Sequence, residues 1–320
     1  MSTDSSVGVG VEIGGGKTTV ALIDSRGRVC HRYQAKTLRG RPALATLDPY
    51  LRVIDAALAD AQNARLPVRG IGVSIPGSLD PEARRPLHVP ILPALNGFPL
   101  KDLLETRYHL PTCLHVDVDA AMLGEHRFGA GQGFRRLLFL TVNAVVGASL
   151  VIDGELIRQP QYVGHICHVP VATSGPRCSC GKRGCINSLV SMEAVQKMVQ
   201  RALRRDEESS LIRRLLNREC FSPQLLAEEA LRGDSVAVQI YSEVGRWLGA
   251  AIAKYINLFE PNGLILGGGV LHASELLLTH VRNSLTPPSN TSSQVCTMVE
   301  VVAAVLGSDA ALIGAAVPLL

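Results

Sequence analysis

Several features that would place a chain in a functional class at once are missing from this sequence. No stretch approaches the ~20 apolar residues that a membrane-spanning helix needs, and residues 1–6 lack the basic-then-apolar order of a secretory signal. We therefore expect a cytoplasmic protein without a membrane segment. The chain has no solenoid repeat, no low-complexity tract and, ahead of Val7, no candidate helix-turn-helix. Direct DNA binding by this chain is not expected.

Charge is also scarce and unfocused. Charged residues make up 19% of the 320 positions, and the net charge of +4 comes from residues scattered along the chain. Such a distribution gives no footprint for nucleic acid or for an anionic membrane. Hydrophobic residues make up 47%, which is enough for an ample core and, at this length, for two lobes.

The eight cysteines are distributed unevenly. Three of them, Cys178, Cys180 and Cys185, lie within eight residues. In a chain without an export signal this clustering favours a metal site over disulfides. The other five are dispersed and are expected to be buried small hydrophobic residues; they are Cys30, Cys113, Cys167, Cys220 and Cys296.

Strand and helix patterns alternate along the chain and predict an α/β fold. The predicted strands are 7–11, 18–23, 68–75, 113–118, 137–141, 148–153, 263–266 and 300–306. The predicted helices are 42–65, 100–108, 119–128, 235–258 and 310–317, with mostly helical sequence from residue 192. Glycine turns follow the first strand at residues 14–16 and the strand 263–266 at residues 267–269.

The loop 159–187 is rich in Gly, Pro, His and Cys and lacks periodicity, so something other than an apolar core must order it. Its ligand spacing is His168, nine residues, Cys178, one residue, Cys180, four residues, Cys185. Four N/S ligands suit a closed, tetrahedral, structural zinc site. The alternative is buried cysteines beside an ordinary half-buried histidine. If residues 165–168 are extended, alternation turns Cys167 away from His168 and leaves His165 free to face a cleft.

Further motifs accompany the cysteine loop. They are Glu12–Lys17, Ile75–Gly77, Asp117–Glu125, Asn257–Pro261, Gly267–Gly269 and Ile313–Ala316. Together with Gly164-His165-Ile-Cys-His168 and the Cys178–Cys185 loop, they resemble the ROK family (repressors, open reading frames and kinases) over nearly the whole chain. The resemblance implies an actin-like (ribonuclease H-like), two-lobed α/β fold with an interlobe cleft, and a homodimer. The expected divisions are a lobe at 1–118, a lobe at 119–303 with the zinc loop, and a C-terminal helix at 304–320 packed back on the first lobe.

The resemblance also implies functional roles. In the family's kinases a carboxylate at Asp117 contacts the sugar and takes the proton from the hydroxyl that attacks ATP. His165 and Asn187 fall at further sugar-contacting positions. Nucleotide binding is implied for Gly14, Gly15, Gly16, Lys17, Gly147, Gly267, Gly268 and Gly269. Alternatively, the glycine runs are simply tight turns and His165 is a loop histidine without a ligand; some N-acetylmannosamine kinases of the family do tolerate histidine there.

This sequence departs from the family pattern at several of these positions. Glu12 replaces the family's opening aspartate, and residues 143–145 read Asn-Ala-Val where the family's second phosphate turn reads Gly-Thr-Gly. His165 and Asn187 replace glutamates, and Val116 replaces the asparagine before the base. Because each change removes a hydrogen-bonding group or alters a turn, the set argues against ordinary hexose phosphorylation.

Three hypotheses follow. The chain looks most similar to the Mlc- and NagC-type sugar-responsive repressors, at 125–130, 146–148 and 232–249, but starts without their winged helix. The preferred hypothesis is a zinc-containing effector module that binds a sugar, a sugar phosphate or a protein partner, with weak or absent phosphotransfer. The alternative is an ATP- and Mg-dependent kinase of the 6-hydroxyl of a hexose or N-acetylhexosamine, with Asp117 as base. A purely structural zinc protein is the third. Asp117 does not separate the first two, because the repressors also keep an aspartate there.

Overall fold

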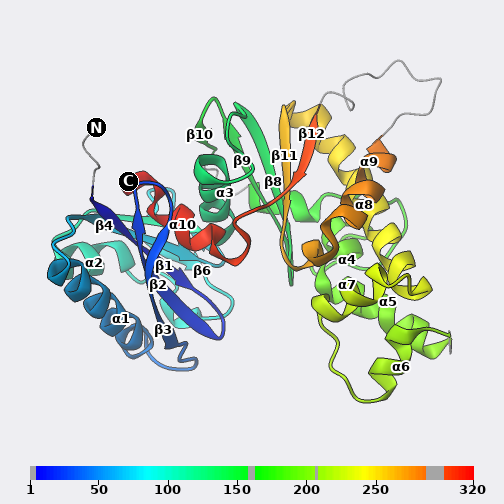
Figure 1. Cartoon of the computed structure of the whole chain (residues 1–320), viewed down its shortest axis with the longest axis horizontal. Coiled ribbons are helices and arrows are strands. Elements are labelled where there is room, and N and C mark those ends of the chain that lie inside the picture. Colours follow the sequence, from blue (N-terminus) through cyan, green and yellow to red (C-terminus); the bar gives the residue numbers. More distant parts are fainter. Residues whose placement is uncertain (1–4, 158–162, 206–207, 286–298) are drawn as a thin grey trace. The chain divides into compact units, whose positions relative to one another are not determined.

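The computed structural model describes residues 5–157, 163–205, 208–285 and 299–320 and divides the chain into two compact units (Figure 1). The first unit comprises residues 1–133, 156–160 and 305–320, and the second comprises 134–155 and 161–304. The first unit is thus discontinuous in sequence, because the end of the chain returns to it.

The first unit is built on a five-stranded sheet in the order β3-β2-β1-β4-β7. Its strands are β1 (Val7–Ile13), β2 (Lys17–Asp24), β3 (Val29–Lys36), β4 (Val68–Ile75) and β7 (Thr112–Val116). β1, β2 and β3 form an antiparallel meander, whereas β4 and β7 extend the sheet in parallel from β1. A separate antiparallel pair joins β5 (Ser78–Leu79) to β6 (Pro86–His88). β1 and β2 are buried almost throughout, as strands covered on both faces should be.

Helices cover both faces of this sheet. Val20 and Leu22 of β2 pack in the core that contains α1 (Ala43–Asn63), while the alternate residues Ala21 and Ile23 pack against α10 (Ala310–Ala316). α10 also lies against α3 (Asp117–Phe128). The remaining helical segments of this unit are α2 (Leu100–Tyr108), η1 (Pro93–Leu95), η5 (Gly307–Asp309) and η6 (Val317–Leu319).

α10 approaches the sheet unusually closely at Gly72 of β4. A Cβ atom at this position would lie 1.8 Å from the carbonyl oxygen of Ala315. Because the neighbouring atom belongs to backbone, only glycine fits without moving the helix.

The second unit has its own five-stranded sheet, in the order β10-β9-β8-β11-β12. Its strands are β8 (Arg136–Val142), β9 (Val146–Ile152), β10 (Glu155–Leu156), β11 (Gly263–Gly267) and β12 (Glu300–Ala303). β8 pairs with β9 as an antiparallel hairpin, and β11 lies parallel to both β8 and β12. β8 and β11 therefore end at the same edge of the sheet.

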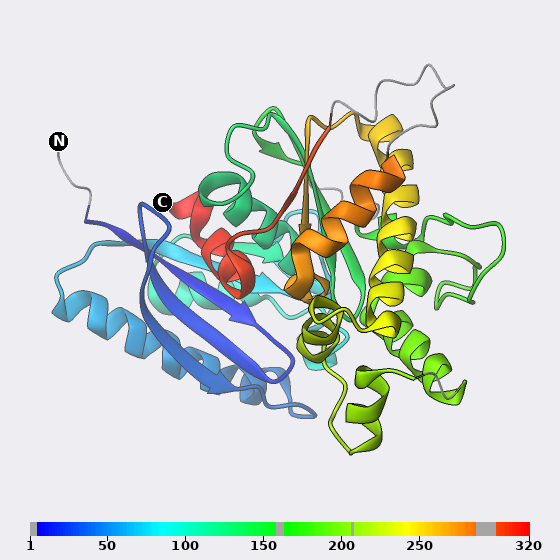
Figure 2. The same cartoon turned by 45° about the vertical axis from the view of Figure 1, so that its right-hand side comes forward.

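The helices of the second unit are α4 (Ile186–Val190), α5 (Met192–Arg204), α6 (Ser210–Leu216), α7 (Pro223–Leu231), α8 (Ser235–Phe259), α9 (Ser274–Leu285), η2 (Val163–His168) and η3 (Gly269–Ala273). Four of them, α5, α6, α7 and α8, are preceded by an N-cap residue whose side chain accepts a hydrogen bond from a backbone N–H of the first turn. The N-cap residues are Ser191, Ser209, Ser222 and Asp234. α8 and α9 lie side by side (Figure 2). Across the described residues, no helix combines the length and apolarity needed to cross a membrane.

The observed boundaries differ from the predicted ones in instructive places. α3 begins at Asp117 rather than at 119, and the first unit continues to residue 133 rather than 118, because α3 packs on α10. β12 ends at Ala303, and Leu306 instead donates its N–H to the buried carboxylate of Glu125 at 2.8 Å. β3 was not predicted, because this strand is largely exposed and only Tyr33 and Ala35 alternate toward the core on the side of α1.

Candidate functional site

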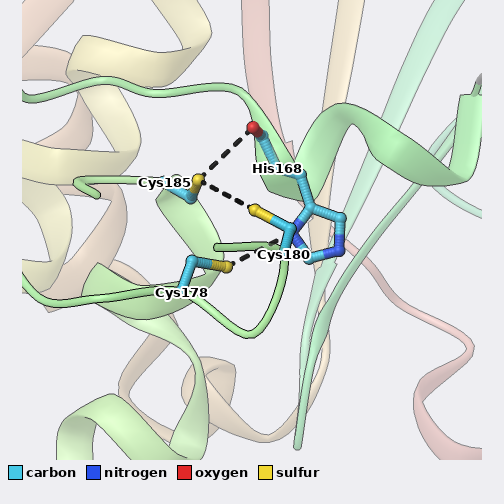
Figure 3. Close-up of side chains that lie close together, drawn as sticks. All are labelled: His168, Cys178, Cys180 and Cys185. Atoms are coloured by element: carbon cyan, nitrogen blue, oxygen red, sulfur yellow. Dashed lines mark hydrogen bonds between the residues drawn. The ribbon is translucent and has the colours of Figure 1, made fainter. Parts of the chain in front are cut away.

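Three cysteines and a histidine of the second unit converge on one point (Figure 3). The ligand atoms of His168, Cys178, Cys180 and Cys185 all lie within 4.8 Å of one another. Sγ of Cys180 is 3.7 Å from Sγ of Cys185, and Nδ1 of His168 is 3.3 Å from Sγ of Cys178. A disulfide needs about 2.05 Å between sulfurs, whereas a tetrahedron with Zn–S bonds of about 2.3 Å has edges of about 3.8 Å. The cluster therefore fits a four-coordinate metal ion.

A tight turn and a short bridge bring these four residues together. Cys178 donates its N–H to the carbonyl of Lys182 at 2.8 Å, and Gly181 donates back to the carbonyl of Cys178 at 2.9 Å. An isolated β-bridge pairs Pro170 with Cys185, which brings the chain after His168 beside the start of α4. The loop is closed on itself by backbone contacts, and the cluster lies where its two ends meet.

The thiols of the cluster differ in acidity. Burial, followed by hydrogen bonds with the neighbouring thiols, raises the pKa of Cys185 to about 12. The backbone amide of Lys182 lowers the pKa of Cys180. Without a cation, the Cys185 thiol keeps its proton at neutral pH. A divalent metal would supply the missing positive charge and displace thiol protons.

The segment that carries His168 is a 3₁₀ turn, not the extended segment expected from the sequence. Val169 donates its N–H to the carbonyl of Ile166 at 3.0 Å, and the hydroxyl of Tyr255 on α8 donates to the same carbonyl at 3.0 Å. The argument from alternation therefore fails here. Cys167 is buried outside the cluster, and this burial raises its pKa to about 11. The backbone of His165 lies in η2, but its side chain lies outside the described residues, so its sugar contact stays a prediction.

Asn187 connects the metal loop to the β8–β9 turn. It is the second residue of α4, which starts directly after Cys185, and its Oδ1 accepts the N–H of Val146 at 2.9 Å. The carboxamide oxygen thus already accepts one bond within the protein, and its second lone pair and the NH₂ group are what remain for a sugar. The predicted sugar contact of Asn187 is untested.

The predicted nucleotide-binding glycines of the second unit surround the shared end of β8 and β11. Gly147 pairs with Thr141 inside the β8–β9 hairpin, and Gly267 is the last residue of β11. Gly268 has a φ of +97°, and a Cβ there would lie 2.4 Å from the carbonyl oxygen of Val142. The glycine turn therefore lies directly against the end of β8. Ligands of α/β sheets characteristically bind outside the carboxyl ends of parallel strands.

The carbonyl groups of the glycine turn between β1 and β2 accept hydrogen bonds from the short segment 37–39. Thr37 donates its hydroxyl to the carbonyl of Gly14 at 2.7 Å and its N–H to that of Gly16 at 3.1 Å. Arg39 donates Nε–H to the carbonyl of Gly15 at 2.9 Å. Sequence reasoning identified the turn but missed both partners, because nothing in the sequence places 37–39 beside it. Gly14 also donates its N–H to the carbonyl of Lys17 at 3.1 Å, so the turn has the N–H groups of Gly15 and Gly16 to offer to an anion.

Asp117 is the remaining candidate site residue of the first unit. It follows β7 as the first residue of α3, and its Oδ1 accepts the N–H of Val118 at 2.8 Å. Desolvation raises its pKa above the ordinary value, and backbone hydrogen bonds partly offset that shift. The residue is nevertheless exposed, so water screens part of the effect.

Two further carboxylates of the first unit, Glu12 and Asp309, bear on the electrostatics around Asp117. Burial raises the pKa of Glu12, and the charges of Asp117 and Asp309 raise it further. Asp309 also forms a 2.7 Å ion pair with Arg32 of β3. Sequence reasoning missed Asp309, because nothing in its local sequence distinguishes it from a residue that simply precedes a helix.

Comparison with known proteins decides the family. The sequence profile of the ROK family matches residues 8–319. The chain belongs to the ROK family. A ROK relative, the glucokinase of Thermotoga maritima, is 31% identical over 314 residues, which cover 96% of this chain and 95% of that protein. The repressor Mlc of Escherichia coli is 26% identical over 253 residues, 79% of this chain and 61% of the repressor.

A solved ROK structure agrees over the same length. The ROK glucokinase of Streptomyces griseus, in complex with glucose and AMPPNP, superimposes with a TM-score of 0.76 at 30% identity, covering 97% of this chain and 98% of that one. The predicted family and the predicted two-lobed, actin-like α/β fold are both confirmed.

Proposed function

We propose that this ROK protein is an ATP-dependent sugar kinase that phosphorylates a hydroxyl of a hexose or N-acetylhexosamine. This was the alternative hypothesis from the sequence. The effector hypothesis preferred there has the weaker support: the glucokinase of Thermotoga maritima is similar over its full length, whereas the match to Mlc covers 61% of that repressor.

The observation that carries the proposal is the carboxylate of Asp117. It stands exposed at the carboxyl end of β7, with a raised pKa. A sugar hydroxyl that attacks the γ-phosphate must lose its proton, and a carboxylate with a raised pKa is a stronger base for that transfer. The N–H groups of Gly15 and Gly16 would hold phosphate oxygens in the same unit.

We propose that Glu12 faces the magnesium ion that accompanies ATP. Repulsion from Asp117 and Asp309 contributes to the raised pKa of Glu12, and a divalent cation would relieve that repulsion. Oxygen ligands of this kind are those that Mg²⁺ prefers. Bound with ATP, the ion would neutralise charge on the phosphates, while Asp117 performs the proton transfer.

We further propose that zinc is the metal of the His168, Cys178, Cys180 and Cys185 cluster and that its role is structural. The donor set and the 3.7 Å sulfur separation support this. By holding the start of α4, zinc would fix Asn187 and, through it, the β8–β9 turn. The homodimer expected from the family resemblance stays a prediction.

A coupled assay of ADP release tests the kinase proposal. Wild-type protein is offered ATP-Mg with glucose, other hexoses, N-acetylglucosamine and N-acetylmannosamine. We expect turnover on at least one sugar, and loss of that turnover in Asp117→Asn by roughly 10²- to 10⁴-fold, the usual contribution of a general base.

Asp102→Asn is the matched control, because Asp102 lies in the first turn of α2 in the same unit. It should keep wild-type turnover. Zinc-loaded wild-type protein that binds a sugar of this panel but releases no ADP would contradict the proposal and return support to the effector hypothesis.

A further inference from the structure

Asn143 begins the β8–β9 turn, and its main chain is held from both sides. Its N–H donates to the carbonyl of Val145 at 3.1 Å, and its carbonyl accepts the N–H of Met192, the first residue of α5, at 2.9 Å. The side chain therefore extends from a fixed point on the carboxyl edge of the sheet.

The carboxamide of Asn143 reaches the glycine turn that follows β11. Its Oδ1 accepts the N–H of Gly269 at 2.9 Å, and its Nδ2 donates to Oγ1 of Thr141 at 3.0 Å. A backbone N–H can only donate, so the oxygen of the carboxamide must be the atom that faces Gly269. The two turns are thereby joined by one exposed side chain.

The N–H of Gly269 lies in the glycine turn that the family resemblance assigns to nucleotide binding. Gly269 is the first residue of η3, which runs directly into α9. The first amides of a helical segment lack intrahelical acceptors, and such amides bind phosphate and other anions. In this chain the amide of Gly269 is already satisfied by Asn143.

We propose that Asn143 is a latch across the nucleotide site of the second unit, and that nucleotide binding requires its carboxamide to leave Gly269. The inference rests on the proposed function, since it takes the turns at 143–147 and 267–269 as that site. A neutral hydrogen bond contributes about 0.5–1.5 kcal/mol net. The latch therefore lowers nucleotide affinity by roughly three- to tenfold.

The experiment is a calorimetric titration of AMPPNP with Mg²⁺ into wild type and into Asn143→Ala. We expect the variant to bind with a Kd roughly three- to tenfold lower. If the protein turns over sugar, its KM for ATP should fall in the same proportion while kcat stays near the wild-type value. A bond with only a structural role would not produce this gain.

Asn262→Ala is the matched control. Oδ1 of Asn262 accepts the N–H of Arg136 at 3.0 Å, so the same kind of bond joins β8 to the segment before β11 at the opposite end of these strands. Its loss should lower the melting temperature about as much as Asn143→Ala does and leave the Kd for AMPPNP unchanged. Asn143→Ser serves as the second variant if the alanine protein unfolds.

The outcomes separate the latch from the kinase proposal. An unchanged or higher Kd in folded Asn143→Ala, or no AMPPNP binding by either protein, overturns the latch. Tighter binding by Asn143→Ala without ADP release on any sugar supports the latch and contradicts the kinase proposal.

Discussion

At the scale of single residues, Asp117 is subject to opposing effects. Desolvation favours its neutral form, whereas the N–H groups of Val118 and of Asp117 itself favour the carboxylate. Desolvation is the larger effect, so the pKa lies above the ordinary 3.8. The group is a better proton acceptor than a fully solvated aspartate, and it requires a higher pH to be ready as a base.

This shift predicts a pH dependence. kcat/KM should fall as the pH drops through the raised pKa of Asp117, with a midpoint above 3.8. Stability should show the opposite sign: a raised folded-state pKa stabilises the protonated form, and that contribution is lost as pH rises through it. Asp117→Asn should therefore melt at pH 7 no lower than wild type. A pH–rate profile measures kcat/KM, and thermal unfolding at several pH values measures stability. If the residual activity of Asp117→Asn fell with pH as the wild-type activity does, the fall would belong to another group.

At the scale of elements, the local sequence pattern predicted the helices and strands whose bounds depend on neighbouring residues in the chain. The helix 100–108 was predicted with its observed bounds, and the strand 68–75 likewise. The 3₁₀ turn at residues 163–168 was not predicted. The carbonyl of Ile166 in this turn accepts the hydroxyl of Tyr255, which is distant in sequence. The bond between Asn143 and Gly269 spans 126 residues. Contacts of that kind depend on the parallel pairing of β8 and β11, which a local pattern does not specify.

The metal loop provides the prediction at this scale. Cys185→Ser should reduce zinc from about one ion per chain to a small fraction, and the unfolding free energy should fall by roughly 3 kcal/mol or more, as for a ligand present at a hundred times its Kd. Amide exchange in the β8–β9 turn should quicken as well, since α4 supports that turn through Asn187. Elemental analysis, denaturant unfolding and hydrogen exchange measure these effects.

Cys220→Ser is the control for the metal loop. Cys220 was expected to be buried, as was Cys30, but both are exposed free cysteines, and Cys220 lies outside the cluster. The variant should keep its zinc and its stability. Equal zinc content in the two variants would show that the cluster does not hold the metal.

At the scale of the whole molecule, the last sixteen or so residues complete a unit that the first residues begin. Gly72→Ala tests this packing, because its Cβ would collide with the backbone of Ala315. We expect the free energy of unfolding to fall by about 1–3 kcal/mol, and denaturant unfolding measures this change. Arg32→Ala provides a comparison: it removes the partly exposed ion pair with Asp309, which joins β3 to η5 just before α10, and should lower the unfolding free energy by about 1 kcal/mol or less. A neutral Gly72→Ala would show that α10 does not press on β4.

The discontinuity of the first unit also sets an order on its assembly. Ribosomes release a chain from its amino end, and domains made of contiguous sequence can fold as they emerge. All strands of the second sheet have been synthesised once Ala303 has been added. The first sheet, although its strands are synthesised earlier, has an incomplete core on the side lined by Ala21 and Ile23 until Leu312, Ile313 and Ala316 have been added. The part of this protein that is translated first is therefore finished last.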